Sequence, residues 1–217
     1  MTYPQYQILS IDNEYLSKLT YQINRKSTAI EIPVDEKPLP FGNCYWNVDS
    51  IVRKQGGKMV LGWEINLLEG SHLAAVHHAI YQQPDGSLTD VTAKMPTCSH
   101  MKKTIFIPDN KLSIDLNKTP AIGMQFHIID DNRFVRAYIE AYRKVNELEK
   151  KQSNFLYSIG YKCENNRAIA NGLPPTGASL SKAEAEIYQQ LESNLHQARI
   201  LITEARKALK SHMQNGH

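Results

Sequence analysis

The sequence predicts an α+β fold, in which a helix that carries a cysteine packs on an antiparallel sheet and a helical arm follows. Three observations predict it: apolar residues at helical spacing directly after Cys44, alternating strand-like segments up to residue 129, and long heptad-like patterns after residue 131. A chain of 217 residues that is 41% hydrophobic can build one core of ordinary size. We therefore expect a core over residues 1–130 and an arm over residues 131–217.

The first elements lead the chain to the cysteine. Apolar spacing predicts a short helix over residues 15–23, and alternation predicts a strand over 29–34. Pro38, Pro40 and Gly42 then keep the chain extended. From Cys44 a helix of about three turns is expected, with Asn43 as its N-cap and a glycine pair at 56–57 as its stop.

Strands are expected over residues 58–68, 74–81, 87–92 and 104–108, and an apolar cluster between 120 and 129 completes a five-strand core. The segment Gln83-Pro84-Asp85-Gly86 has the composition of a tight turn, because proline presets one turn position and glycine accepts a positive φ. It predicts a hairpin between the second and third of these strands.

The arm is expected to hold a long helix from 132 to about 156, a loop over 157–180 and a final amphipathic helix over 182–213. The final helix carries an apolar stripe at spacings of three and four: Ile187, Leu191, Leu195, Ala198, Ile202, Ala205 and Leu209. This stripe can pack on the preceding helix or on a second molecule. A homodimer through residues 182–213 is therefore one possibility.

Composition argues against several classes of protein. A net charge of +3, from 25 basic and 22 acidic residues, is too small a bias to predict nucleic-acid binding. Residues 1–6 lack the features of an export signal, and no apolar run approaches the roughly 20 residues that span a bilayer. Three widely spaced cysteines favour free thiols in a reducing compartment. We expect a cytoplasmic protein without a membrane partner.

Cys44, His78 and Asp90 are the candidates for catalysis. Depending on which residues form the turn, His78 lies directly opposite Asp90 or is its diagonal neighbour. In both registers the two side chains share one face of the sheet, while His77 points to the other face. Asp90 would then orient His78, and His78 would serve as base for a Cys44 thiolate that a helix N-terminus stabilises.

Each of these residues also has a structural interpretation. Free cysteines are often buried for packing, and a His-Asp pair across a hairpin can be a plain structural hydrogen bond. Asn43 and Asn47 are candidates to stabilise an oxyanion together with the backbone N–H of Cys44, although Asn43 is equally explained as a helix cap. Trp63 is a candidate for positioning a substrate, and it fits the core as well.

Metal and cofactor sites are not expected. Cys98, His100 and Cys163 lack the paired, closely spaced ligands of a structural zinc site. The glycine pair at 56–57 lacks the lysine and hydroxyl of a phosphate-binding loop.

Several segments between residues 42 and 135 resemble the papain-like and transglutaminase-like superfamily, which orders a helix-terminal cysteine, a strand histidine and an aspartate or asparagine on the following strand. More narrowly, they are similar to small, mostly uncharacterised bacterial and phage proteins, some of which carry a cysteine-rich zinc tail of the SEC-C type. The similar segments are 44–48, 56–57, 62–65, 78–81, 85–86, 90–92 and 106–109. Around Cys163 this chain has one cysteine, so the zinc tail does not carry over.

The resemblance implies a papain-like core and cysteine-dependent acyl transfer at an amide through a thioester, by a peptidase, amidase, deamidase or transglutaminase-like enzyme. The resemblance names no substrate, and we expect a protein or peptide rather than a small molecule. The alternative is a binding or regulatory module that keeps this fold without catalysis and acts through its helical arm.

Overall fold

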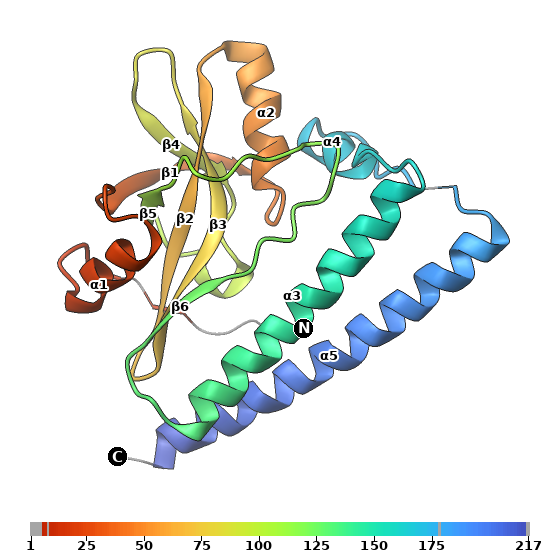
Figure 1. Ribbon diagram of the computed structural model, residues 1–217. Helices are drawn as coiled ribbons and strands as arrows, with labels where there is room; N and C mark the ends of the chain where they lie inside the picture. Colours follow the sequence, from red (N-terminus) through yellow and green to blue (C-terminus); the bar gives the residue numbers. More distant parts are fainter. Residues whose placement is uncertain (1–5, 8, 178, 216–217) are drawn as a thin grey trace.

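The computed structural model describes residues 6, 7, 9–177 and 179–215 (Figure 1). Residues 1–5, which belong to the segment expected to lack an export signal, lie outside the described residues. The helices are α1 (Glu14–Ile23), α2 (Cys44–Gln55), α3 (Arg133–Ser158), α4 (Glu164–Ala170) and α5 (Lys182–Asn215), with a 3-10 turn at Pro96–Cys98. The strands are β1 (Ile30–Leu39), β2 (Lys58–Leu68), β3 (His72–Gln82), β4 (Leu88–Thr92), β5 (Lys103–Pro108) and β6 (Gln125–Ile128).

The sheet closes on itself. Its strand order is β2-β5-β1-β4-β3-β6, and β2 also pairs with β3, so that five strands form a barrel and β6 lies outside it on β3. The α+β class is confirmed. The antiparallel prediction is wrong for one pair, because β1 and β4 run parallel. Closure needs glycine at position 62, where a Cβ would lie 2.3 Å from the carbonyl oxygen of Ile107.

The barrel interior is filled by alternate residues of its strands. Ile32, Ile80 and Phe106 are fully buried there and form one apolar cluster. His78 is two residues before Ile80 on β3, so it faces the same interior side. The barrel interior therefore contains an apolar cluster and, next to it along β3, polar side chains such as His78.

Helices cover the barrel from outside. α2 packs on β3, β2 and β4, with Val48 in one cluster with Ala79 and Tyr81 (Figure 1). Asn13 caps α1, because its side chain accepts a hydrogen bond from the Tyr15 amide, and the helix buries Leu16 and Leu19 in a separate cluster.

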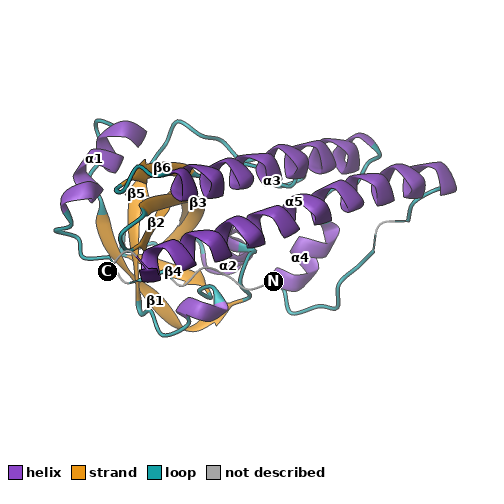
Figure 2. Cartoon of the chain, turned by 90° about the horizontal axis from the view of Figure 1, so that it is seen from below, coloured by secondary structure: helices purple, strands orange, loops and turns teal. Residues whose placement is uncertain are grey.

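α3 and α5 form a long antiparallel pair beside the barrel (Figure 2). Asn132 caps α3 by accepting hydrogen bonds from two backbone amides. The apolar stripe of α5 packs within the chain: Leu195 and Ala198 join Val145, and Leu209 joins the cluster of Val135 and Tyr138. The stripe therefore packs on the preceding helix, α3, which is one of the two possibilities that the sequence allowed.

Candidate active site

Cys44 is the first residue of α2 and a free thiol. The extended β1 strand and Gly42, with φ of 75°, deliver the chain to this point. Asn43 occupies the N-cap position without a capping side-chain hydrogen bond, which contradicts its predicted role as a cap. The first-turn N–H groups of α2 thus stay uncapped by this side chain, and the positive end of the helix dipole lies at the cysteine.

Cys44 lines a cavity of about 470 Å³, although only 9% of the residue is exposed. The same cavity is lined by His78 and by residues of α3 and of the segment before it. Cys44 also belongs to an apolar cluster with Val48. The thiol therefore has a largely apolar environment and one open side.

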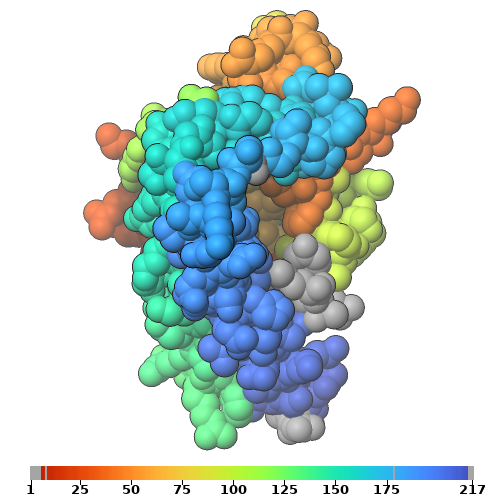
Figure 3. Space-filling view, turned by 90° about the vertical axis from the view of Figure 1, so that its right-hand side faces the viewer, coloured from red at the N-terminus to blue at the C-terminus, as the bar shows by residue number. Residues whose placement is uncertain are grey.

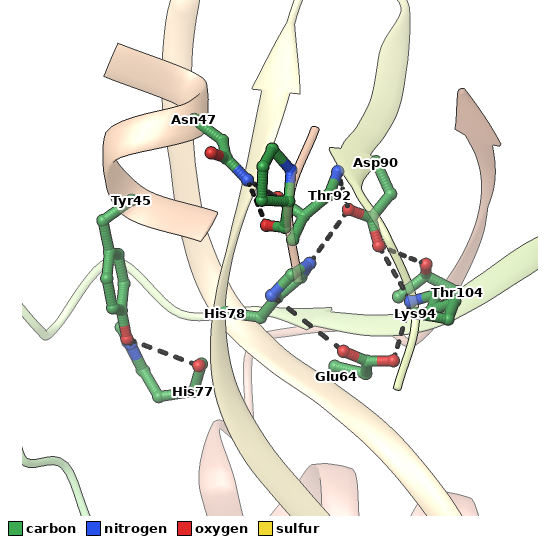
Figure 4. A network of polar contacts seen from close by, with 10 residues as sticks. Tyr45, Asn47, Glu64, His77, His78, Asp90, Thr92, Lys94 and Thr104 are labelled. Atoms are coloured by element: carbon green, nitrogen blue, oxygen red, sulfur yellow. Dashed lines mark hydrogen bonds and ion pairs between the residues drawn. The ribbon is translucent and has the colours of Figure 1, made fainter. Parts of the chain in front are cut away.

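His78 and Asp90 are joined inside the barrel (Figure 4). Nε2 of His78 donates to Oδ1 of Asp90 over 3.0 Å, and both residues are buried. The hairpin pairs Tyr81 with Thr89, which continues to Ile80 opposite Asp90. This is the second of the two registers considered from the sequence, so His78 is the diagonal neighbour of Asp90.

Cys44 and Asp90 act on His78 together. Burial opposes protonation of the imidazole, but the charges of Asp90 and Cys44 and the hydrogen bonds to both raise the pKa of His78 well above its ordinary value. Because Nε2 donates to Asp90, Nδ1 is the nitrogen left for the thiol. The arrangement favours an imidazolium next to the sulfur.

Two further residues, Glu64 and Lys94, complete a buried charge network that sequence reasoning missed (Figure 4). Nζ of Lys94 donates to Oδ2 of Asp90 over 2.8 Å and to Oε1 of Glu64 over 2.7 Å. Oε2 of Glu64 lies 3.9 Å from Nδ1 of His78. Lys94 thus links the two carboxylates that flank the imidazole.

The network holds Asp90 and Lys94 in their charged forms. Burial alone would raise the pKa of Asp90, but His78 and Lys94 hold it well below its ordinary value. Burial alone would lower the pKa of Lys94, but Glu64 and Asp90 raise it. Asp90 also accepts hydrogen bonds from the hydroxyl of Thr104 over 2.5 Å and the amide of Thr92 over 3.1 Å. These contacts fix the carboxylate that orients His78.

His77 has a different environment. Burial and the neighbouring His78 lower its pKa to about 4, against an opposing effect of Asp109, so the ring is neutral at pH 7. The Tyr45 hydroxyl, whose own pKa burial and Cys44 raise, lies 2.7 Å from Nδ1 of His77. The aspartate therefore contacts His78, and His77 is held by Tyr45.

Asn43 and Asn47 lie next to Cys44, yet both of their amide groups are engaged. Nδ2 of Asn43 donates to Asn47 and to the carbonyl of Asn166, and Nδ2 of Asn47 donates to the carbonyl of Pro40 and to Thr92. In this arrangement neither side chain offers a free N–H to an oxyanion. The backbone N–H of Cys44 is the remaining donor of those considered from the sequence.

Trp63 is not part of the cavity wall. Its indole N–H donates to Asp109 over 3.1 Å, its ring meets His77 edge-on, and it packs in the cluster of α1. The core interpretation of this tryptophan agrees with the structure.

α4, which falls in the expected loop over 157–180, packs against α2 (Figure 3). Nδ2 of Asn166 donates to Oδ1 of Asn43, and the hydroxyl of Ser50 donates to Asn171. Cys163 and Ala170 enter the apolar cluster of α2. The prediction of a loop is wrong here, and this segment braces the helix that carries Cys44.

Within the described ranges, no three His, Cys, Asp or Glu side chains gather so that they could hold a metal ion. Cys98 packs near the carbonyl of Tyr6, and Cys163 lies 3.5 Å from the hydroxyl of Thr119. Among the described helices, none combines the length and the apolar character that crossing a bilayer requires.

Comparison with known proteins gave no match: no family model, no curated protein and no solved structure resembles this chain significantly.

Proposed function

We propose that the protein is a cysteine-dependent enzyme that transfers the acyl group of an amide, with Cys44 as nucleophile, His78 as acid and base, and Asp90 as orienting residue. One observation carries the proposal: an imidazole that is hydrogen-bonded to a buried carboxylate lines the same cavity as a thiol at a helix N-terminus. A papain-like or transglutaminase-like relationship is part of the proposal, and the order Cys, His, Asp supports it.

The chemistry proceeds in two steps. The Cys44 thiolate attacks the amide carbonyl, and the new C–S bond leaves an oxyanion next to the N-terminus of α2. The His78 imidazolium gives its proton to the leaving amine as the C–N bond breaks, which yields a thioester. In the second step neutral His78 accepts a proton from water or from an amine that attacks the thioester. Release of the acyl group restores the thiol.

Acylation by p-nitrophenyl acetate tests the proposal. We expect a burst of nitrophenolate and one acetyl group on the Cys44 peptide by mass spectrometry. Cys44→Ser and His78→Ala should each reduce the burst at least a hundredfold. A double variant, Cys98→Ser with Cys163→Ser, serves as control and should keep it. Acetylation spread over the three cysteines, or a burst indifferent to His78, would contradict the proposal.

A binding module of the same fold is the second candidate, and one observation favours it: Cys44 is only 9% exposed and shares a cluster with Val48. In such a module the thiol packs α2 on the barrel, and the α3–α5 pair contacts the partner. Cys44→Ala would then lower the unfolding free energy by about 1 to 2 kcal/mol, while no reagent would acylate the wild-type thiol rapidly.

A further inference from the structure

The cavity beside Cys44 is much larger than the thiol group that lines it. Its volume of about 470 Å³ is about three times that of a cavity of ~150 Å³, which accommodates benzene. It also falls within the ~300–1,000 Å³ range of small-molecule sites. A group larger than one aromatic ring can therefore enter next to the sulfur.

Polar and apolar side chains line different parts of the cavity. Glu64, Asn66 and His78 come from β2 and β3, where alternation places them on one face. Apolar side chains come from α3 and from the segment that enters and forms β6: Ile122, Met124, Phe126 and Val145. A group bound beyond the thiol would thus meet mainly carbon atoms.

The charges near the cavity already have partners. Lys94 is paired with both Glu64 and Asp90. Glu149 lies 3.3 Å from Arg199, and Arg143, with 68% of its side chain exposed, lies 3.7 Å from Glu140 at the solvent side. A charged group that loses its hydration next to the buried Lys94, Glu64 and Asp90 would find these charges already paired with one another, which costs several kcal/mol.

We infer that this cavity is the acyl-donor site and that it takes an apolar, uncharged acyl group larger than a single aromatic ring. The inference rests on the proposed function, because it assigns the substrate class of the same thiol. The cavity would accept an apolar side chain of a peptide, or the acyl group of an apolar amide, in preference to an acidic or basic group.

Three chloromethyl ketones test the selection, since each forms a thioether with the thiol and presents its acyl part as a substrate would. The reagents are the acetyl-phenylalanyl, acetyl-glutamyl and acetyl-lysyl compounds, and each rate at Cys44 is divided by the rate with iodoacetamide. The phenylalanyl reagent should have the highest ratio by at least tenfold. Equal ratios, or a higher ratio for a charged reagent, would overturn the inference while leaving an activated thiol intact.

A matched pair of variants tests whether the cavity wall determines the preference among the three reagents. Met124 lines the cavity, whereas the next residue, Gln125, is exposed. Met124→Asp should lower the phenylalanyl ratio about tenfold and raise the lysyl ratio, because it places a carboxylate in the apolar part of the cavity wall. Gln125→Asp should change neither. Equal effects of the two variants would contradict the assignment. If iodoacetamide itself fails to label wild-type Cys44 faster than Cys98, the proposed function fails and this inference with it.

Discussion

His78 lies between two carboxylates, and a single lysine holds both of them. Lys94 is 2.8 Å from Asp90 and 2.7 Å from Glu64, with only 5% of its side chain exposed. A buried charge network of this kind is balanced only when every member is present, because removal of one ion leaves the others desolvated and unpaired. Lys94 therefore controls His78 indirectly, through the carboxylate that orients it.

Lys94→Met should lower the unfolding free energy by roughly 3 to 5 kcal/mol at pH 7, since it leaves the buried Asp90 and the half-buried Glu64 without the lysine that links them. Urea titration followed by circular dichroism measures the change. Lys103→Met is the matched control, because the ion pair of Lys103 with Glu31 lies at the surface and its loss should cost less than about 1 kcal/mol. Similar losses in both variants would show that the buried network does not stabilise the fold.

Cys44, His78 and Asp90 could be predicted from the sequence because local rules place them. Side-chain alternation on two strands, together with a tight turn, brings His78 and Asp90 to one face. Glu64 and Lys94 could not be predicted in the same way. Glu64 reaches His78 diagonally across the β2–β3 pair, which depends on the exact register of that pair, and Lys94 lies beyond the end of β4, where strand alternation no longer indicates its direction.

The helix that carries Cys44 is supported by a second helix. Asn43 replaces the usual capping contact with hydrogen bonds to Asn47 and Asn166, and α4 supplies Asn166 from a distant part of the chain. The start of α2 is thereby fixed by a tertiary contact. We therefore expect the orientation of the thiol to depend on α4.

Asn166→Ala removes the hydrogen bond from Nδ2 to Asn43 and should cost about 1 kcal/mol of unfolding free energy. It should also slow iodoacetamide labelling of Cys44 several-fold, because the first turn of α2 is then less well fixed. Asn194→Ala, on α5, is the control and should leave the labelling rate unchanged. A stability loss without any effect on labelling would mean that α4 supports the fold and not the thiol.

Neither α4 nor the pairing of β1 with β4 could be predicted from sequence patterns, and the reasons differ. α4 has only seven residues and is followed closely by Asn171-Gly172 and Pro174-Pro175, which are typical of loops. The parallel pairing of β1 with β4 joins strands far apart in the chain, which no local spacing indicates. By contrast, α2 and β2 follow clear periods, and their predicted limits agree closely with the structure.

At the scale of the whole molecule, the α3–α5 pair lies beside the barrel, and α3 forms one wall of the cavity. Val145 of α3 lines the cavity and also packs on Leu195 of α5. The division into a core and an arm stays a prediction, as does the homodimer. The stripe of α5 is buried at Leu195, Ala198 and Leu209, whereas Ile187 is exposed, so a dimer would have to use the start of the stripe or another face.

Leu209→Ala should lower the unfolding free energy by about 2 to 4 kcal/mol, because Leu209 is fully buried against Val135 and Tyr138. Leu201→Ala is the control on the same helix; Leu201 is 57% exposed, and its loss should cost less than about 0.5 kcal/mol. Both values come from urea titration. A larger effect of Leu201 than of Leu209 would indicate that α5 packs through its other face.

The pH dependence of iodoacetamide labelling at Cys44, read by peptide mass spectrometry, tests the central claim most directly. Wild type and His77→Ala should label rapidly even near pH 6, where an ordinary thiol with a pKa of about 8.5 is protonated, and His78→Ala should lose this reactivity. Slow labelling in the wild type that rises only above pH 8 and is indifferent to His78 would contradict an activated thiolate and leave the binding module as the better account.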